Sequence, residues 1–307
     1  MKVTVDQMIR ETADVKRFRL RATDGRELPR FSAGAHIATT AGGFERNYSL
    51  VDGDREFYEI AIRRESGSRG GSVYWHDRVS EGDEVEIRCP KNHFPLSFRA
   101  KHHVFFAAGI GITPFMAMMR ELSERGASFE LHYAARSRAD CAFYDAIQRR
   151  FGSNACFYFS KTGHRLTTER LLELPIGSHV YFCGPESFIH DFTEAALSLG
   201  YPKGSLHHER FAAKPVPNPQ PFTLVLAKTG QTLHVPKNKT VLEVLRETGV
   251  KVPYSCRVGA CGTCEVEVLK GKIDHYDSFL SDEEREKEDT MLTCVSRCRS
   301  GKLILNL

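Results

Sequence analysis

The chain has 307 residues, of which 41% are hydrophobic and 27% are charged. This composition is typical of a globular protein, and the length suggests about two domains of roughly 150 residues, or three smaller ones. The net charge of +4 is too small to indicate a nucleic-acid partner. No stretch approaches the ~18 uninterrupted apolar residues of a membrane helix, and residues 1–6 alternate like a strand, without the apolar core of a signal peptide. We therefore expect a cytoplasmic protein that binds neither nucleic acid nor membrane.

Short strands occupy the first 98 residues. The segments Lys16 to Ala22, Phe57 to Arg63 and Glu84 to Arg88 each alternate with a period of two. Turns containing Gly, Asp and Pro separate such segments, and no long helix is evident. This pattern predicts a small antiparallel β-barrel over residues 1–98.

The pattern changes near His103, because His103 to Ala108 form a continuous apolar run that suits a buried parallel strand. Helices and strands then alternate strictly. The expected helices are Pro114 to Arg125, Ala142 to Arg150, Thr167 to Leu174 and Glu186 to Leu199, and the further strands are Phe129 to Ala135, Cys156 to Ser160 and Val180 to Cys183. This order predicts a doubly wound α/β domain over residues 99–213.

Residues 214–221 have proline at every second position. Such a segment cannot pair in a sheet and favours an extended, semi-rigid linker. We expect the main domain boundary here, followed by one small α+β domain over residues 222–307.

The nine cysteines are unlike a disulfide set, because the cytosol keeps thiols reduced. Four of them are scattered, and we expect ordinary buried side chains at Cys89, Cys141, Cys156 and Cys183. The others cluster near the C-terminal end. Four of these follow the spacing of a plant-type [2Fe–2S] site, namely Cys256, Cys261, Cys264 and Cys294.

The glycines of this cysteine loop support an iron–sulfur cluster. Gly259 and Gly262 allow the positive φ values and close backbone approach that a loop wrapped around a cluster needs. Structural zinc usually takes two separate Cys-x2-Cys pairs, and only one is present. Cys298 is either an alternative ligand or a packing residue.

Eight acidic residues lie between Asp274 and Asp289, against only Arg285 and Lys287. They form either a solvated helical face capped by Ser281 or a docking patch that steers a basic partner toward the cluster.

A [2Fe–2S] cluster accepts one electron at a time, whereas nicotinamide gives a hydride, which carries two electrons together. A flavin is the usual cofactor that couples the two, so the ferredoxin segment predicts a flavin site upstream. The segment Arg46-Asn47-Tyr48-Ser49 resembles the Arg-x-Tyr-Ser signature of ferredoxin-reductase-like flavin barrels. Tyr48 can lie against the isoalloxazine ring, Ser49 can bond its polar edge, and Arg46 can meet phosphate. The turn from Gly67 to Ser72 is either a second phosphate contact, through its amides, Arg69 and Ser72, or a flexible hairpin.

Two further turns indicate a nicotinamide site. Gly109 to Pro114 resembles the Gly-x-Gly-x-Thr-Pro turn of ferredoxin-reductase-type nicotinamide domains, and Cys183-Gly184-Pro185 resembles their Cys-Gly-Pro turn. Both follow predicted parallel strands, at the edge where ligands bind open α/β sheets. Alternatively, Cys183 is simply a core thiol.

The order of flavin, nicotinamide and ferredoxin segments resembles the phthalate dioxygenase reductase family over essentially the whole chain. The resemblance extends to Tyr254 to Cys264, Ser278 to Glu284 and Met291 to Val295. It implies a β-grasp-like ferredoxin domain, FMN as the flavin, and roles in catalysis for Ser49, Thr113 and Cys183. The implied cofactor contacts are Arg46, Asn47, Tyr48, Ser49, Ala61, Ile62, Arg63, Arg69, Gly70, Gly71, Ser72, Gly109, Gly111, Thr113, Pro114, Cys183, Gly184, Pro185 and Phe211.

The resemblance further implies that electrons pass from NADH through FMN and the [2Fe–2S] cluster to a terminal Rieske-type oxygenase. The alternatives are a stand-alone NAD(P)H diaphorase or ferric reductase, and an iron–sulfur redox sensor. The coenzyme is less well defined by the sequence. Basic residues Arg136, Arg138 and Lys161 stand where the family often has an acidic group, so NADPH is the alternative to NADH.

Overall fold

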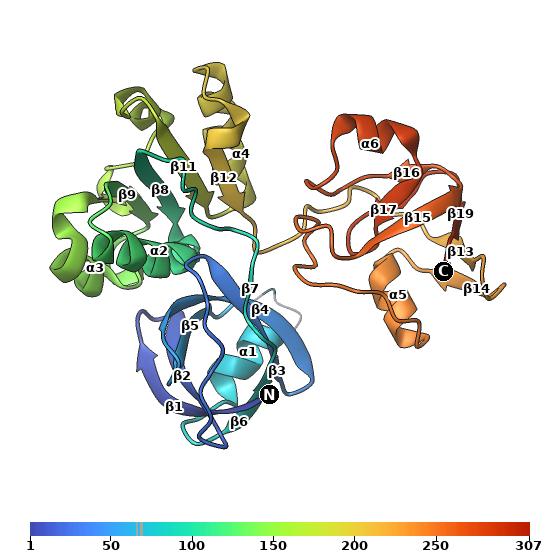
Figure 1. The fold of residues 1–307 in the computed structure, drawn as a ribbon, viewed down its shortest axis with the longest axis horizontal. Helices are drawn as coiled ribbons and strands as arrows, with labels where there is room; N and C mark the ends of the chain where they lie inside the picture. Colours follow the sequence, from blue (N-terminus) through green and yellow to red (C-terminus); the bar gives the residue numbers. More distant parts are fainter. Residues whose placement is uncertain (66, 68–69) are drawn as a thin grey trace. The chain divides into compact units, whose positions relative to one another are not determined.

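The computed structural model describes residues 1–65, 67 and 70–307. The chain forms two compact units, Met1–Glu209 and Arg210–Leu307, which Figure 1 colours from blue to yellow and from yellow to red. The Pro-rich residues 214–221 form neither helix nor strand. The finer division into domains at residues 98, 213 and 221 stays a prediction.

The first part of the first unit is a closed antiparallel barrel, as predicted. Its strands follow the order β4-β5-β2-β1-β6-β3, and pairing of β3 with β4 closes the ring. The strands are β1 (Lys2–Arg10), β2 (Val15–Ala22), β3 (Ala35–Ala41), β4 (Phe44–Gly53), β5 (Tyr58–Arg63), β6 (Glu84–Ile87) and β7 (Lys91–Asn92), the last of which pairs with β3.

A short helix that the sequence analysis did not predict, α1 (Gly71–Asp77), packs against the barrel core. Its Trp75 is fully buried and lies edge-on to Phe18, with ring centroids 4.8 Å apart. Seven residues are too few for a clear helical period, which explains why the pattern was missed.

The rest of the first unit is a five-stranded parallel sheet in the order β10-β9-β8-β11-β12, which confirms the doubly wound α/β fold. The chain winds outward from β8 to one edge and then crosses to the other. The strands are β8 (His102–Ala108), β9 (Phe129–Ala135), β10 (Ala155–Phe159), β11 (Ser178–Cys183) and β12 (Leu206–Glu209), and the helices are α2 (Thr113–Glu124), α3 (Tyr144–Phe151) and α4 (Glu186–Ser198).

The sheet packs on both faces. Phe105 belongs to a core shared with α2 and α3, and Phe106 to a core shared with α4. The α-helix expected from Thr167 to Leu174 is instead a 3-10 helix, Thr168–Glu173. Leu174 precedes Pro175 and is extended, because the proline ring disfavours the helical conformation in the residue before it.

The second unit is an α+β domain, as predicted. Its sheet follows the order β14-β13-β19-β15-β17, and β13 and β19 are parallel. The elements are β13 (Phe222–Leu226), β14 (Thr232–Val235), α5 (Val241–Glu247), β15 (Glu265–Lys270), β16 (Ile273–Asp274), α6 (Asp282–Lys287), β17 (Thr290–Leu292), β18 (Arg297–Cys298) and β19 (Lys302–Leu305). A capping box between Thr240 and Glu243 starts α5, whose apolar side faces the core.

Across the described residues, no helix is both long and apolar enough to cross a membrane.

Candidate redox sites

The proposed flavin residues Arg46, Tyr48 and Ser49 lie on β4. The Arg46 side chain passes so close to Gly71 that a Cβ there would lie 2.8 Å from Arg46 Cγ. Gly70 has a φ of 89° and immediately precedes α1. The structure therefore brings a guanidinium and the amides at the start of α1 together, as a phosphate site requires. The proposed contact Arg69 lies outside the described residues.

Tyr48 is held by the barrel core. Its ring lies edge-on to Trp75 at a centroid distance of 6.1 Å, and burial raises the pKa of its hydroxyl. On β5, Ala61 and Ile62 are buried, and their contact with the flavin stays a prediction. Ser72 Oγ accepts a hydrogen bond from the Glu65 amide at 3.1 Å.

The two proposed nicotinamide turns touch each other. A Cβ on Gly111 would lie 2.1 Å from the carbonyl oxygen of Cys183, so only glycine fits between them. Gly184 in turn lies against Ala108, the last residue of β8. These turns end the adjacent strands β8 and β11, where an open sheet binds its ligands.

The start of α2 is fixed by Thr113 and Pro114, as the turn signature predicts. The Thr113 hydroxyl donates to the Ile110 carbonyl at 3.0 Å, and its side chain is buried. Pro114 stands in the first helical turn, where its missing N–H costs nothing. Arg63 reaches toward this turn, since its Nη1 lies 3.9 Å from a Cβ placed on Gly109.

Glu209 joins the flavin strand to the nicotinamide turns, and the sequence analysis missed it. It pairs with Cys183 in the β11–β12 ladder, and the Ser49 hydroxyl donates to its carboxyl oxygen at 3.4 Å. Burial raises the pKa of Glu209 to about 8, and the Ser49 hydrogen bond lowers it only partly. Burial, and then the Glu209 charge, raise the pKa of the Cys183 thiol well above its ordinary value. No short sequence signature marks Glu209, because its position depends on the pairing of β12 with β11.

Phe211 belongs to the second unit and is 46% exposed. Its contact with the flavin stays a prediction.

The four proposed cluster ligands form two pairs. The Cys256 thiol interacts with Cys261, and a hydrogen bond between the two lowers the pKa of Cys261 and raises that of Cys256. Cys264 interacts in the same way with Cys294, which lowers the pKa of Cys264 and raises that of Cys294. The amides of Val258 and Ala260 donate to Cys256 Sγ, each at 3.4 Å.

Two pairs of thiols fit a two-iron cluster, which takes two protein ligands at each iron. Four thiols in two pairs are therefore a donor set that fits a [2Fe–2S] cluster.

Glycines let the cysteine loop fold tightly. Gly259 and Gly262 have φ values of 76° and 71°, as predicted. A Cβ on Gly262 would lie 2.4 Å from the ring of Phe279, and one on Gly259 would lie 2.7 Å from Val295. The segment around Phe279, a side chain that is 47% exposed, thus covers the loop.

Outside the loop, the cysteine predictions are only partly correct. Cys141 and Cys183 are buried, but Cys89 and Cys156 are exposed, so the prediction was wrong for these two. Cys89 lies in the loop after β6, and Cys156 lies on β10, which is an edge strand of the parallel sheet. Cys298 lies on β18, paired with Ile273 of β16.

The acidic segment contains the expected capped helix. Ser281 and Glu284 form a capping box at the start of α6, and no α6 side chain is buried. Asp277 is the exception to the solvated acidic face, because its side chain is buried and accepts hydrogen bonds from the amides of Phe279 and Leu280 at 3.1 and 2.9 Å.

The raised pKa of Glu209 predicts a pH-dependent stability. In the unfolded chain the carboxyl loses its proton near its ordinary pKa of 4.5, whereas the folded chain holds the proton up to about pH 8. The contribution of Glu209 to stability should therefore be greatest below pH 4.5, fall as the pH rises to about 8, and level off above that. Glu209→Gln cannot ionise, so its Tm should fall less between pH 5 and 8. Parallel Tm–pH curves for the two proteins would contradict this.

Comparison with known proteins agrees with these sites. A family model described as a 2Fe-2S iron-sulfur cluster binding domain matches residues 224–299. The carnitine monooxygenase reductase subunit of Escherichia coli (strain K12) is 41% identical over 315 residues, which cover 100% of this chain and 98% of the relative. The heme-dependent oxidative N-demethylase beta subunit of Ectopseudomonas mendocina (strain ymp) is 42% identical over 284 residues, with coverage of 91% and 90%.

A solved structure shows the same architecture. Phthalate dioxygenase reductase, described as a modular structure for electron transfer from pyridine nucleotides to [2Fe-2S], matches with a TM-score of 0.82 and 35% identity, over 100% of this chain and 98% of that one. The chain therefore belongs to the phthalate dioxygenase reductase family and is an oxidoreductase with flavin, nicotinamide and [2Fe–2S] sites, the reductase component of an oxygenase or demethylase system.

Proposed function

We propose that this reductase holds FMN, oxidises NADH and delivers electrons to a Rieske-type oxygenase. The observation behind the proposal is one chain of contacts in the first unit. Gly111 of the first nicotinamide turn meets Cys183 of the second, Cys183 pairs with Glu209, and Glu209 accepts a hydrogen bond from Ser49 on the flavin strand. This chain of contacts supports one shared site for flavin and nicotinamide.

The arrangement of Arg46, Gly70 and Gly71, which we call the phosphate cradle, supports FMN over FAD. Arg46 lies across Gly71, and Gly70 and Gly71 open helix α1, so one guanidinium and one helix start converge on one place. A single terminal phosphate matches this arrangement. Flavin supplies the exchange between two-electron and one-electron chemistry, and the residues on β4 and α1 supply its position.

The basic residues considered for NADPH are largely engaged with acids. Lys161 Nζ lies 3.5 Å from Asp140, and Arg138 pairs with Asp145 at 3.1 Å and lies over the Tyr144 ring. The Lys161 amide also donates to the carbonyl of Arg136, so the ends of β9 and β10 adjoin. Asp140 places a negative charge in this region, which favours NADH over the 2′-phosphate of NADPH.

A second candidate function differs in the type of oxygenase that receives the electrons. The family resemblance favours a Rieske centre, but the N-demethylase relative is named as heme-dependent, so a haem partner is the alternative. Affinity capture of the reductase from its own cells, followed by visible spectroscopy of the co-purified subunit, separates the two. A Rieske spectrum supports the proposal, and a Soret band overturns that part of it.

The cysteine pairing predicts that a ligand substitution removes the cluster but not the flavin. In Cys261→Ala, one iron loses a thiolate, so [2Fe–2S] absorbance and cytochrome c reduction should disappear. Flavin content and NADH-to-ferricyanide activity should stay close to wild type, because the first unit is a separate compact body. Cys298→Ala is the matched control and should retain the cluster. Wild-type iron content in Cys261→Ala would exclude this ligand.

The phosphate cradle predicts the flavin itself. Acid should release FMN from the purified protein, identified by chromatography, and NADH should bleach the visible spectrum of the intact protein. Arg46→Ala should weaken flavin binding roughly ten- to a hundredfold, which corresponds to one charge-assisted hydrogen bond of about 1.5–3 kcal/mol. Release of FAD would overturn the assignment of Gly70 to Ser72 as a terminal phosphate site.

Coenzyme choice is tested by kcat/KM for NADH and NADPH. We expect the wild type to prefer NADH, and Arg136→Ala and Lys161→Ala to leave that preference within about threefold, because removing a charge-assisted hydrogen bond to a phosphate would lower kcat/KM roughly tenfold or more. Arg149→Ala, an exposed change on α3, is the control. A wild-type preference for NADPH that collapses in either of the first two variants would show that they bind a 2′-phosphate.

A further inference from the structure

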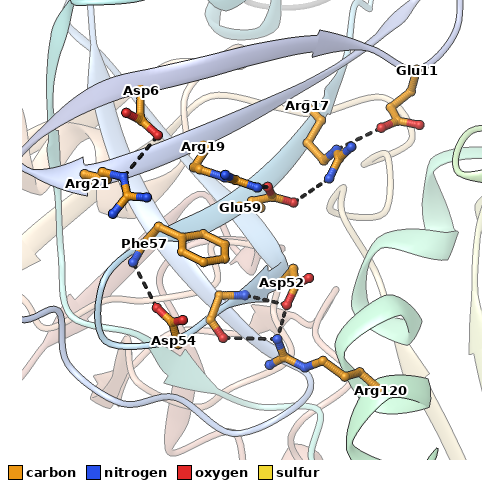
Figure 2. A network of polar contacts seen from close by, with 11 residues as sticks. Asp6, Glu11, Arg17, Arg19, Arg21, Asp52, Asp54, Phe57, Glu59 and Arg120 are labelled. Carbon is orange, nitrogen blue, oxygen red and sulfur yellow. Dashed lines mark hydrogen bonds and ion pairs between the residues drawn. The ribbon is translucent and has the colours of Figure 1, made fainter. Parts of the chain in front are cut away.

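A polar network joins the barrel to helix α2 within the first unit. Arg120 of α2 forms an ion pair with Asp52 of β4 and donates a second hydrogen bond to the Gly53 carbonyl at 3.1 Å, as Figure 2 shows. One guanidinium thereby binds a side chain and a backbone group of the same strand. We call the pair of Arg120 and Asp52 the clasp.

The clasp connects β4 and α2, the strand and the helix that carry the proposed redox residues Ser49 and Thr113. Asp52 follows Ser49 by three residues on β4, and Arg120 follows Thr113 by seven residues on α2. At the usual rise of a strand and of a helix, each is about 10 Å from its site residue. A shift of α2 along β4 at the clasp would therefore move the nicotinamide turn relative to the flavin strand.

Asp52 lies beside a bulge in β4 and opposite a buried residue of β5. The β4–β5 register shifts between Leu50 and Asp52, which places a bulge next to Asp52 and turns the strand end. Asp52 pairs with Glu59 in this ladder. The Glu59 carboxylate is buried, and it accepts hydrogen bonds from Arg17 at 2.6 Å and Arg19 at 2.9 Å.

A second connection lies on the same network. Glu11 accepts a hydrogen bond from Arg17 Nε at 2.8 Å and another from the Phe143 amide, just before α3, at 3.3 Å. Figure 2 shows Glu11, Arg17 and Glu59 in one row along the strands. The polar network thus crosses from the barrel to the α/β part at two places. Arg17 links the Glu11 crossing to Glu59, and Asp52 pairs with Glu59 in the β4–β5 ladder.

A small pocket of about 100 Å³ lies beside the clasp and is partly open to solvent, with Asp52, Arg120 and Met116 among its lining residues. Apolar packing next to the pocket holds α2 against β4, because Val51 belongs to the same core as Leu122. Apolar contacts have no preferred direction, so the directed contacts of the clasp are the ones suited to fix the position of α2 along β4.

We propose that Arg120 and Asp52 are positioning residues that set the distance between the nicotinamide turn and the flavin strand, and so control hydride transfer. The proposal rests on the assignment of Ser49 and Thr113 to the redox site. The clasp should contribute little to overall stability, because both side chains are partly exposed. Its effect is on geometry, where a displacement of about 1 Å can cost on the order of a hundredfold in rate.

The experiment uses the full chain with its cofactors. Arg120→Gln and Asp52→Ala each break the clasp, Arg120→Lys keeps the charge, and the Arg120→Gln/Asp52→Ala double variant tests coupling. Arg125→Gln is the matched control, because Arg125 follows the same helix and pairs only with Glu121 of that helix among the ion pairs described. Stopped-flow spectroscopy gives the NADH dissociation constant and the rate of flavin reduction separately. Hydrogen–deuterium exchange without NADH follows residues 50–54 and 113–122.

The clasp predicts that both single variants reduce flavin about ten- to a hundredfold more slowly, with NADH affinity and flavin content within about twofold of wild type. Exchange should be faster in both peptides, Arg120→Lys should recover most of the rate, and the double variant should be no slower than either single one. If Arg120→Gln loses its flavin, Asp52→Ala and Arg120→Lys decide the question.

Unchanged reduction rates in both single variants would overturn the proposal, and so would additive losses in the double variant or an equal loss in Arg125→Gln. Failure of the proposed function has a different signature: wild-type protein that holds no flavin, or whose flavin NADH does not reduce.

Discussion

The contact on which the redox site depends is between Gly111 and the carbonyl oxygen of Cys183. Since a Cβ would lie 2.1 Å from that oxygen, glycine allows the turn after β8 to lie directly on the turn after β11. The parallel pairing of β8 with β11 brings both turns to one edge, and β12 adds Glu209 beside Cys183. Ser49 then meets Glu209 from the barrel. A nicotinamide surface and a flavin strand therefore become neighbours through backbone packing.

Each unit gives its redox group a different environment. In the first unit, Cys183 and Glu209 are buried deeply enough to raise their pKa values, so both remain largely neutral near pH 7. In the second unit, backbone amides point at Cys256 Sγ, where they stabilise thiolate charge. A neutral site suits the transfer of a hydride between planar rings, and a site with amide donors suits the binding of an anionic cluster.

The sequence predicted the features that have a short local signature. The barrel strands, the alternating strands and helices, the two turns and the cysteine spacing depend on residues that are close in the chain. Glu209 could not be found in this way, because its role arises from a β11–β12 pairing and from Ser49, 160 residues away. The exposure of Cys89 and Cys156, the burial of Asp277 and the clasp likewise depend on tertiary neighbours. Helix α1 was missed because seven residues show no clear period.

In the first unit, the interactions that stabilise the fold differ from those that fix the position of one element relative to another. Stability comes from aromatic side chains with almost no exposed surface, such as Phe105, Phe106 and Trp75, because apolar burial contributes to folding roughly in proportion to its area. That force is not directional, so it tolerates small displacements of one element along another. The contacts of Arg120 with Asp52 and Gly53 contribute little to folding, but they have fixed directions and meet one strand at two points. In the proposed role of the clasp, directed polar contacts therefore set the position of elements that the apolar core already holds together.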